Sequence, residues 1–336
     1  MSSLIPLSVV AAVVPAIVYV VAVWWSDRYE REPGWLLTTA FLWGAIPAIL
    51  LSVAGAVLLQ GPQAVFDTGL RNSLFHGALV APVVEEIAKG LALVGIAVFF
   101  AREIDSTLDG IIYGALVGIG FGMTENFLYF LQVAIEQNGA NWPVVAFLRT
   151  VVFGLNHAFY SAILGAVLGY ALTTRPTTGG RWLLALFGLA AAIVVHGLHN
   201  LVSLLTPFAP ALLLFDVLLS WGGVIVLVVI IVAAWRKEKG WIRTYLADEV
   251  PAVLSEDGYR FAQGAAQRCG GWVALAGGRD RRCARIQHEF QHAATELAFY
   301  KHRLEGIGAD SGAVDETARL RQRLARLDAA LIETLA

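Results

Sequence analysis

The feature that most constrains this chain is a series of apolar runs, each long enough to cross a lipid bilayer. A membrane-spanning helix needs about 20 mostly apolar residues. Because the bilayer core offers no water to backbone N–H and C=O groups, such runs must be helical. The sequence therefore predicts an all-α protein, a polytopic bundle of about seven transmembrane helices. The runs lie near residues 4–25, 35–60, 76–101, 109–133, 147–172, 181–205 and 211–235.

The composition agrees with a membrane protein. Of the 336 residues, 57% are hydrophobic and 15% are charged, whereas a soluble protein carries about 25% charged residues. The net charge of −2 argues against a broadly basic protein that binds nucleic acid. The first apolar run is too long for a signal peptide and lacks a basic leading segment, so we expect a permanent span. Cys269 and Cys283 lack the spacing of metal ligands, and we expect no disulfide framework.

The basic residues between the runs predict the orientation of the chain in the cell membrane. Short cytoplasmic loops carry an excess of Lys and Arg. We therefore expect the N-terminus outside the cytoplasm and the C-terminal part inside it. The residues assigned to the cytoplasmic side are Arg28, Arg31, Arg102, Arg175, Arg181, Arg236, Lys237, Lys239 and Arg243, against Arg71 and Arg149 on the other side.

The composition changes after the last apolar run, and we divide the chain into a membrane domain (1–239) and a cytoplasmic tail (240–336). Within the tail, residues 282–304 have helical periodicity, and residues 316–335 repeat leucine at three- and four-residue steps. The glycine-containing segment 306–310 is expected to form a turn between them. The tail is thus predicted to be a small soluble helical hairpin, whose partner the sequence does not identify.

Two of the predicted spans carry small residues at every fourth position. Such stripes allow the backbones of two membrane helices to approach closely. We therefore expect spans 109–133 and 147–172 to pack against each other along these faces. The stripes are Gly110, Gly114, Gly118 and Gly122 in the first span, and His157, Ser161, Gly165 and Gly169 in the second.

Ionisable and amide side chains interrupt four of the apolar runs. A charge near the centre of a membrane helix costs roughly 2.5–3.5 kcal/mol even on the insertion scale, so such residues mark functional sites by default. From a rise of about 1.5 Å per residue, the four helices each carry their polar group about 12–15 Å below the expected outer surface. One layer of polar groups predicts a single site that water can reach. The residues are Glu85, Glu86 and Lys89, then Glu125 and Asn126, then His157, and finally His196, His199 and Asn200.

These side chains suit the hydrolysis of a peptide bond. A buried carboxylate can act as general base for water, and histidine or asparagine can donate hydrogen bonds to an oxyanion. Ser161 is the only serine considered as a nucleophile, and the pattern argues against it. A transporter or scaffold that uses the same groups as a proton relay is the alternative from another class. We expect no bound cofactor or metal; if zinc is present, its expected ligands are Glu86, Glu125, His157 and His196.

The polar residues form four ordered motifs, one in each of four spans. In the first motif the lysine follows the paired glutamates by one helical turn and can pair with either of them. The motifs are Glu85-Glu86-x-x-Lys89, Phe121-x-x-x-Glu125-Asn126, His157-Ala158-Phe159 and His196-x-x-x-Asn200.

These motifs, together with the loop at residues 27–33, resemble the PrsW family of intramembrane proteases, and the resemblance covers roughly residues 15–235. The CAAX-protease and bacteriocin-processing family is more distantly similar. There an arginine follows the paired glutamates and the second motif ends in histidine, where this chain has Lys89 and Glu125. The resemblance to the PrsW family implies site-1-type cleavage of a single-span membrane protein, such as an anti-sigma factor, near its extracytoplasmic side.

The expected site assigns a role to each motif. Glu85 and Glu86 form the general-base pair, and the sequence does not decide which of them is the base. Glutamic chemistry is preferred to a zinc-dependent version of the same reaction. The other expected site residues are Lys89 to orient the pair, Glu125 and Asn126 to support water or substrate, and His157, His196 and Asn200 at the scissile carbonyl.

The tail contains a second motif of chemical interest. His288-Glu289-Phe290-Gln291-His292 matches H-E-x-x-H, which on a helix places two zinc ligands and a general base on one face. The tail is too short for a typical metalloprotease fold and offers no clear third ligand. We interpret the motif as a solvated helix face.

Overall fold

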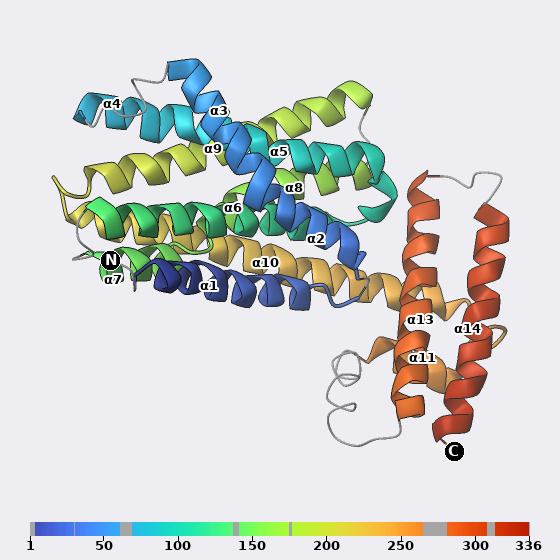
Figure 1. Cartoon of the computed structure of the whole chain (residues 1–336). Coiled ribbons are helices and arrows are strands. Elements are labelled where there is room, and N and C mark those ends of the chain that lie inside the picture. The colour runs from blue at the N-terminus through green and yellow to red at the C-terminus, as the bar shows by residue number, and fades with distance from the viewer. Residues whose placement is uncertain are drawn as a thin grey trace. The chain divides into compact units, whose positions relative to one another are not determined.

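Every regular element that the structure describes is a helix (Figure 1), and the predicted all-α fold class is confirmed. The chain divides into two compact units. The first comprises Met1–Ser26 and Glu32–Ile230, and the second comprises Asp27–Arg31 and Ile231–Ala336. The computed structural model describes residues 4–29, 31–60, 69–136, 141–174, 177–264, 281–307 and 313–335.

Among the described residues, six helices are long and apolar enough to cross a bilayer; they start at Leu4, Gly34, Thr107, Trp142, Thr178 and Ala211. The sequence predicted seven, and the run 76–101 is the one not among them. That run is helical from His76 to Phe99 but carries Glu85, Glu86 and Lys89, so the count of seven is not confirmed. The elements are α1 (Leu4–Ser26), α2 (Gly34–Trp43), η1 (Gly44–Ala48), α3 (Ile49–Gln60), α4 (Leu70–Phe75), η3 (His76–Val80), α5 (Ala81–Phe99), η4 (Ala101–Glu103), α6 (Thr107–Glu136), α7 (Trp142–Phe147), η5 (Leu148–Val152), α8 (Asn156–Thr174), α9 (Thr178–Leu205), α10 (Ala211–Ala247), α11 (Glu256–Gln263), α13 (Arg281–Ile307) and α14 (Ala313–Leu335).

Helix α6 packs against α8 along the small-residue stripes, as the sequence predicted. A Cβ atom on Gly118 would lie 2.0 Å from the carbonyl oxygen of His157. Likewise, a Cβ atom on Gly165 would lie 2.0 Å from the carbonyl oxygen of Gly110. A second face of α6 packs equally closely against α2, because a Cβ atom on Gly120 would lie 2.1 Å from the carbonyl oxygen of Phe41. Glycine therefore lets the backbone of α6 contact two neighbours directly.

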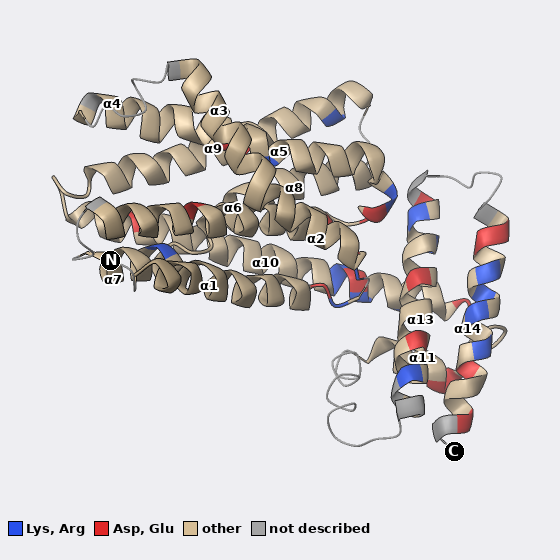
Figure 2. Cartoon of the chain, viewed as in Figure 1, with Lys and Arg blue, Asp and Glu red and all other residues tan. Residues whose placement is uncertain are grey.

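The other helices of the first unit expose apolar side chains. Leu58, Leu183 and Phe187 are 84%, 70% and 68% exposed, respectively. Contiguous exposed apolar surface of this kind marks an interaction surface, here the hydrocarbon of a bilayer. Figure 2 shows few charged residues along the helices of this unit and many on α13 and α14.

The second unit has its own core, formed by the end of α10 together with α11, α13 and α14. Ile242, Leu246, Phe290 and Leu324 are fully buried there. Helices α13 and α14 pack against each other, in agreement with a helical hairpin. Residues 308–310 of the predicted turn and Cys269 lie outside the described residues. The predicted boundary at residue 239 differs from the division at Ile230, because α10 continues without interruption from one unit into the other.

Candidate functional site

The polar residues of the four motifs form one cluster, and its most deeply buried part is an ion pair on α5. Lys89 Nζ donates a hydrogen bond to Glu86 Oε1 over 2.5 Å, and the two side chains are 0% and 2% exposed. The ammonium also lies 4.5 Å from the ring centroid of Phe121 on α6. Since the pair is one helical turn apart, α5 alone positions it, and the neighbouring helices exclude solvent from it.

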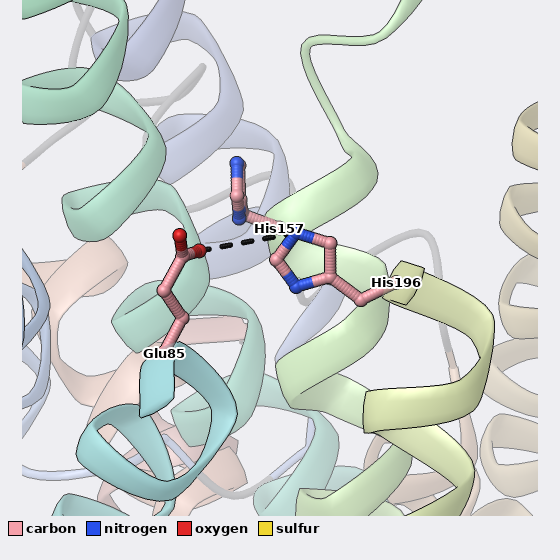
Figure 3. Close-up of side chains that lie close together, drawn as sticks. All are labelled: Glu85, His157 and His196. Atoms are coloured by element: carbon pink, nitrogen blue, oxygen red, sulfur yellow. Dashed lines mark ion pairs between the residues drawn. The ribbon is translucent and has the colours of Figure 1, made fainter. Parts of the chain in front are cut away.

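Two imidazoles lie over this ion pair. His196 on α9 places Nδ1 at 2.8 Å from Glu86 Oε1 and Nε2 at 3.8 Å from Glu85 Oε2. The ring of His157 on α8 is perpendicular to that of His196, with centroids 5.2 Å apart. The ring of Tyr160 stacks on that of His196, with centroids 4.7 Å apart. Figure 3 shows the carboxylate of Glu85 pointing toward the imidazole of His196, with His157 beside it.

A second carboxylate, that of Glu125, is hydrogen-bonded to the imidazole of His157. Glu125 Oε2 on α6 lies 2.7 Å from His157 Nε2 and 2.5 Å from Arg149 Nη2. Arg149 Nε donates to Asn126 Oδ1 over 2.8 Å, and the guanidinium lies 3.8 Å from the ring centroid of Tyr129. The segment η5, a short π-helix, therefore brings a cation to the glutamate of the second motif.

The cluster is open on one side. The side chains of Glu85, Glu125, His157 and Arg149 are 13%, 18%, 15% and 26% exposed, whereas that of His196 is only 3% exposed. The ion pair between Glu86 and Lys89 is almost fully buried. Glu86 and Lys89 are thus the most buried members of the cluster, and Arg149 is the most exposed.

The donor atoms fit a divalent metal. Glu85, His157 and His196 each place one potential ligand atom within 4.8 Å of the others. Because the carboxylate of Glu86 holds Nδ1 of His196, the neutral ring of His196 presents a lone pair on Nε2. The carboxylate of Glu125 holds Nε2 of His157, whose opposite nitrogen, Nδ1, lies 3.3 Å from Lys89 Nζ. Two His and one Glu with an open position are the ligands of a catalytic zinc site. The sequence expectation for such an ion named Glu86 and Glu125, which instead hold the two rings.

The H-E-x-x-H motif of the tail forms no comparable group among the described residues. Glu289 pairs with Arg285 over 2.7 Å, and the neighbouring His292 Nδ1 lies 3.5 Å from Glu296. His288 and His292 are both exposed on α13. These contacts agree with the interpretation of the motif as a solvated helix face.

Asn200, an expected site residue, and Ser161, which the sequence argued against as a nucleophile, have other contacts. Asn200 Nδ2 donates to the carbonyl oxygen of Gly77 over 2.8 Å, which ties α9 to the π-helix η3 before α5. Ser161 lies on the seam, where a Cβ atom on Gly114 would come within 2.5 Å of its carbonyl oxygen. Both residues therefore shape the bundle around the site.

Sequence reasoning missed Arg149 and Tyr160. Arg149 was counted as a loop charge, although it falls inside the predicted span 147–172, where a charge is itself a functional signal. Tyr160 gave no signal that distinguishes it from an ordinary packing residue. Its hydroxyl is buried and has no hydrogen-bond partner within the described structure.

Comparisons with known proteins identify the family of the chain. The model of the family described as "PrsW family intramembrane metalloprotease" matches residues 32–235. Protease PrsW of Bacillus subtilis is 27% identical over 214 residues, which is 63% of this chain and 90% of that protein. Protease PrsW of Clostridioides difficile is 29% identical over 152 residues, which is 44% of this chain and 62% of the relative.

Protease PrsW of Geobacillus kaustophilus is 28% identical over 166 residues, which is 48% of this chain and 65% of the relative. No solved structure matches the chain. The family match covers more than half of the chain and includes every helix that contributes to the cluster. The chain therefore belongs to the PrsW family of intramembrane proteases.

Proposed function

We propose that the chain is an endopeptidase that uses water to cleave a single-span membrane protein, of the anti-sigma-factor kind, near its extracytoplasmic side. The observation that carries the proposal is the convergence of carboxylates and imidazoles from α5, α6, α8 and α9 in an apolar bundle. Peptide hydrolysis needs a group that activates water and groups that stabilise the oxyanion. Membership of a family of intramembrane proteases supports the same class of reaction.

The hydrogen bonds distinguish the two adjacent glutamates. Lys89 and His196 hold Glu86, whereas Oε2 of Glu85 accepts no hydrogen bond from the described residues. In a metal-free reaction Glu85 takes a proton from water while the water oxygen bonds to the scissile carbonyl carbon. The proton then passes to the leaving amine as the C–N bond breaks. Glu86 orients the imidazole of His196 and offsets the charge of Lys89.

A zinc-dependent version is a second candidate, and a specific observation favours it. A carboxylate holds one nitrogen of each imidazole, so neither neutral ring can donate a hydrogen bond to an oxyanion from its other nitrogen. On His196 that nitrogen offers a lone pair, and on His157 it lies 3.3 Å from Lys89 Nζ. Glu85, His157 and His196 would hold the ion, with Glu86 and Glu125 fixing the rings. When bound, zinc lowers the pKa of a ligated water to about 7 and polarises a carbonyl.

We further propose that η3 and α5 form a seventh span. From His76 to Phe99 the helix is about 36 Å long at 1.5 Å per residue, which exceeds the hydrocarbon thickness of about 30 Å. Glu86 and Lys89 of this helix are buried against other helices and do not meet lipid. An odd number of spans agrees with an extracytoplasmic N-terminus and a cytoplasmic tail.

Co-expression with doubly tagged single-span membrane proteins tests the activity. The wild type is expected to release a truncated product from at least one of them, and Glu85→Gln, which keeps the shape of the side chain, is expected to abolish that product. Glu103→Gln, the same chemical change on η4, is the matched control and should cleave normally. A product that persists with Glu85→Gln would exclude Glu85 as base or ligand.

The metal content of the purified full-length protein separates the two versions. In the zinc-dependent version, the wild type retains about one zinc per chain, and Glu85→Ala, His157→Ala and His196→Ala each lose it. Cleavage by protein that has been stripped with a chelator and contains no metal would support the metal-free reaction with Glu85 as base.

A further inference from the structure

A second polar cluster lies one helical turn from the proposed site. Asp216 on α10 is 1% exposed, and its carboxylate contacts two residues of α9. His199 Nδ1 lies 2.6 Å from Oδ1, and Ser203 Oγ donates to Oδ2 over 2.6 Å. An ionisable pair inside a membrane bundle is costly and marks a functional site by default.

Attachment of α10 to the bundle does not by itself require this pair. Between residues 211 and 230, the buried residues of α10 are Asp216 and Ser220, and the apolar side chains around them are half-buried or exposed. Small residues are sufficient to pack membrane helices closely, and Gly223 of α10 already does so against the ring of Phe159. The carboxylate therefore adds a directed hydrogen bond where packing alone needs none.

The pair is connected to both imidazoles of the proposed site. The amide nitrogen of Asn156 lies 3.3 Å from each ring nitrogen of His199, and Asn156 directly precedes His157 in the first turn of α8. The ring of Tyr160 stacks on His196 at 4.7 Å and lies 6.3 Å from the ring of His199. His199 thus contacts Asn156, which precedes His157, and lies near Tyr160, which stacks on His196.

We propose that Asp216 and His199 are positioning residues that fix the orientation of His157 and His196 during peptide-bond hydrolysis, an inference that rests on the proposed function. The carboxylate accepts a hydrogen bond from Nδ1 of His199, which selects one tautomer and stops rotation of the ring. The fixed ring then holds Asn156 and Tyr160 in place. Removal of such an outer partner typically costs 10–100-fold in activity or metal affinity.

The first test is independent of activity. Full-length protein with ¹⁵N-labelled histidine is compared in detergent as wild type, Asp216→Ala and Ser220→Ala. Asp216→Ala is expected to shift the ring resonances of His157 and His196 as well as that of His199. Ser220→Ala removes the other buried polar side chain between residues 211 and 230 of α10, whose hydroxyl has no hydrogen-bond partner in the described ranges, and should shift none of them. A shift confined to His199 would overturn the proposal.

The second test uses a tagged single-span protein that the wild type cleaves. Per folded molecule, Asp216→Ala and His199→Ala are expected to lower kcat about 10–100-fold with little change in KM. The double variant should be no worse than either single variant, because the two residues act as a unit. Asp216→Asn keeps an acceptor for Nδ1 and should recover most of kcat.

The outcomes distinguish this proposal from the proposed function. If the wild type and Glu103→Gln cleave but Glu85→Gln does not, the function stands, and a normal kcat in Asp216→Ala would overturn only the positioning role. A loss that disappears after correction for the amount of folded protein would make the pair a structural anchor and also overturn it. If the wild type cleaves no candidate, the proposed function fails, and the histidine resonances still decide whether Asp216 orients the imidazoles.

Discussion

At the scale of single residues, one buried cation stabilises the site. The ammonium of Lys89 contacts Glu86 Oε1, lies 3.3 Å from Nδ1 of His157 and faces the ring of Phe121. Desolvation of the two charges costs several kcal/mol for each ion, and their hydrogen bond offsets that cost only while both partners remain. The net contribution of the pair to stability is therefore small, although the removal of one partner alone is costly.

Lys89→Met is expected to destabilise the protein by about 3–5 kcal/mol, because it leaves the carboxylate of Glu86 buried without a counter-charge. The double variant Lys89→Met/Glu86→Gln should recover most of this stability and remain inactive. The thermal midpoint of the purified protein in detergent measures the first effect, and cleavage of a co-expressed substrate measures the second. Lys239→Met, which removes an exposed ammonium on α10, is the control and should change stability by less than about 0.5 kcal/mol. Equal stability of Lys89→Met and wild type would contradict the buried-pair argument.

At the scale of elements, the seam between α6 and α8 determines where the second and third motifs lie. Gly118 contacts the backbone of His157 directly, and Gly122 faces the side chain of His157. Any residue larger than glycine at position 118 would push α8 away from α6, and a Cβ atom at position 122 would lie 3.2 Å from the imidazole of His157. The hydrogen bond between His157 and Glu125 would then lengthen, so the seam sets the geometry of the site as well as the fold.

Gly118→Leu and Gly165→Leu are expected to cost at least about 1–3 kcal/mol by overpacking, since a Cβ atom at either position meets a carbonyl oxygen at 2.0 Å. Gly95→Leu on α5 is the matched control, because no heavy atom lies within 4 Å of the added Cβ there. Yields of monodisperse protein and thermal midpoints in detergent compare the three variants. Equal tolerance at all three positions would mean that the backbones do not touch.

The spans and the seam could be predicted from sequence because hydropathy and small-residue spacing are local signals. Whether the run at 76–101 spans the membrane is ambiguous from the sequence. It depends on the burial of Glu86 and Lys89 between helices, which hydropathy does not measure. The π-helical turn η5, which brings Arg149 to Glu125, also has no clear local signal.

The site itself was only partly predictable. Helix rise and antiparallel order are enough to bring Glu85, Glu125, His157 and His196 to one level, and the structure brings them together. Which carboxylate holds which imidazole depends on helix rotation within the bundle, which one sequence does not specify. The pairing of Asp216 with His199 is a contact between neighbouring helices and was missed for the same reason.

At the scale of the whole molecule, the number of spans determines the topology. Six spans would place both ends of the chain on one side of the membrane, whereas seven place them on opposite sides. A reporter that is active only in the cytoplasm is therefore expected to be active after Ala336 and inactive when fused before Met1. The excess of Lys and Arg in the expected cytoplasmic loops predicts which end is inside. Activity at both ends would exclude α5 as a span and the orientation with it.

The second unit has a core of its own and an acid-sensitive ion cluster, so it should respond to pH separately. Glu249 is 2% exposed and accepts hydrogen bonds from Lys301 over 2.7 Å and from Arg321 over 2.8 Å. Burial raises the pKa of this carboxyl, but the hydrogen bonds from Arg321 and Lys301 outweigh burial and hold the pKa below its ordinary value. A carboxyl whose pKa is lowered on folding stabilises the folded state once the pH exceeds the unfolded pKa of about 4.3.

Urea unfolding of the second unit is expected to need less denaturant as the pH falls from about 5 through the folded pKa of Glu249. In full-length protein with Cys269→Ser, a fluorophore on Cys283 of α13 reports this transition. Glu249→Gln should cost about 1–3 kcal/mol at pH 7, toward the lower end because Arg321 is half-exposed. Its stability should also vary less with pH, so that the two curves converge in acid. Parallel curves for wild type and Glu249→Gln would show that other carboxylates carry the acid response.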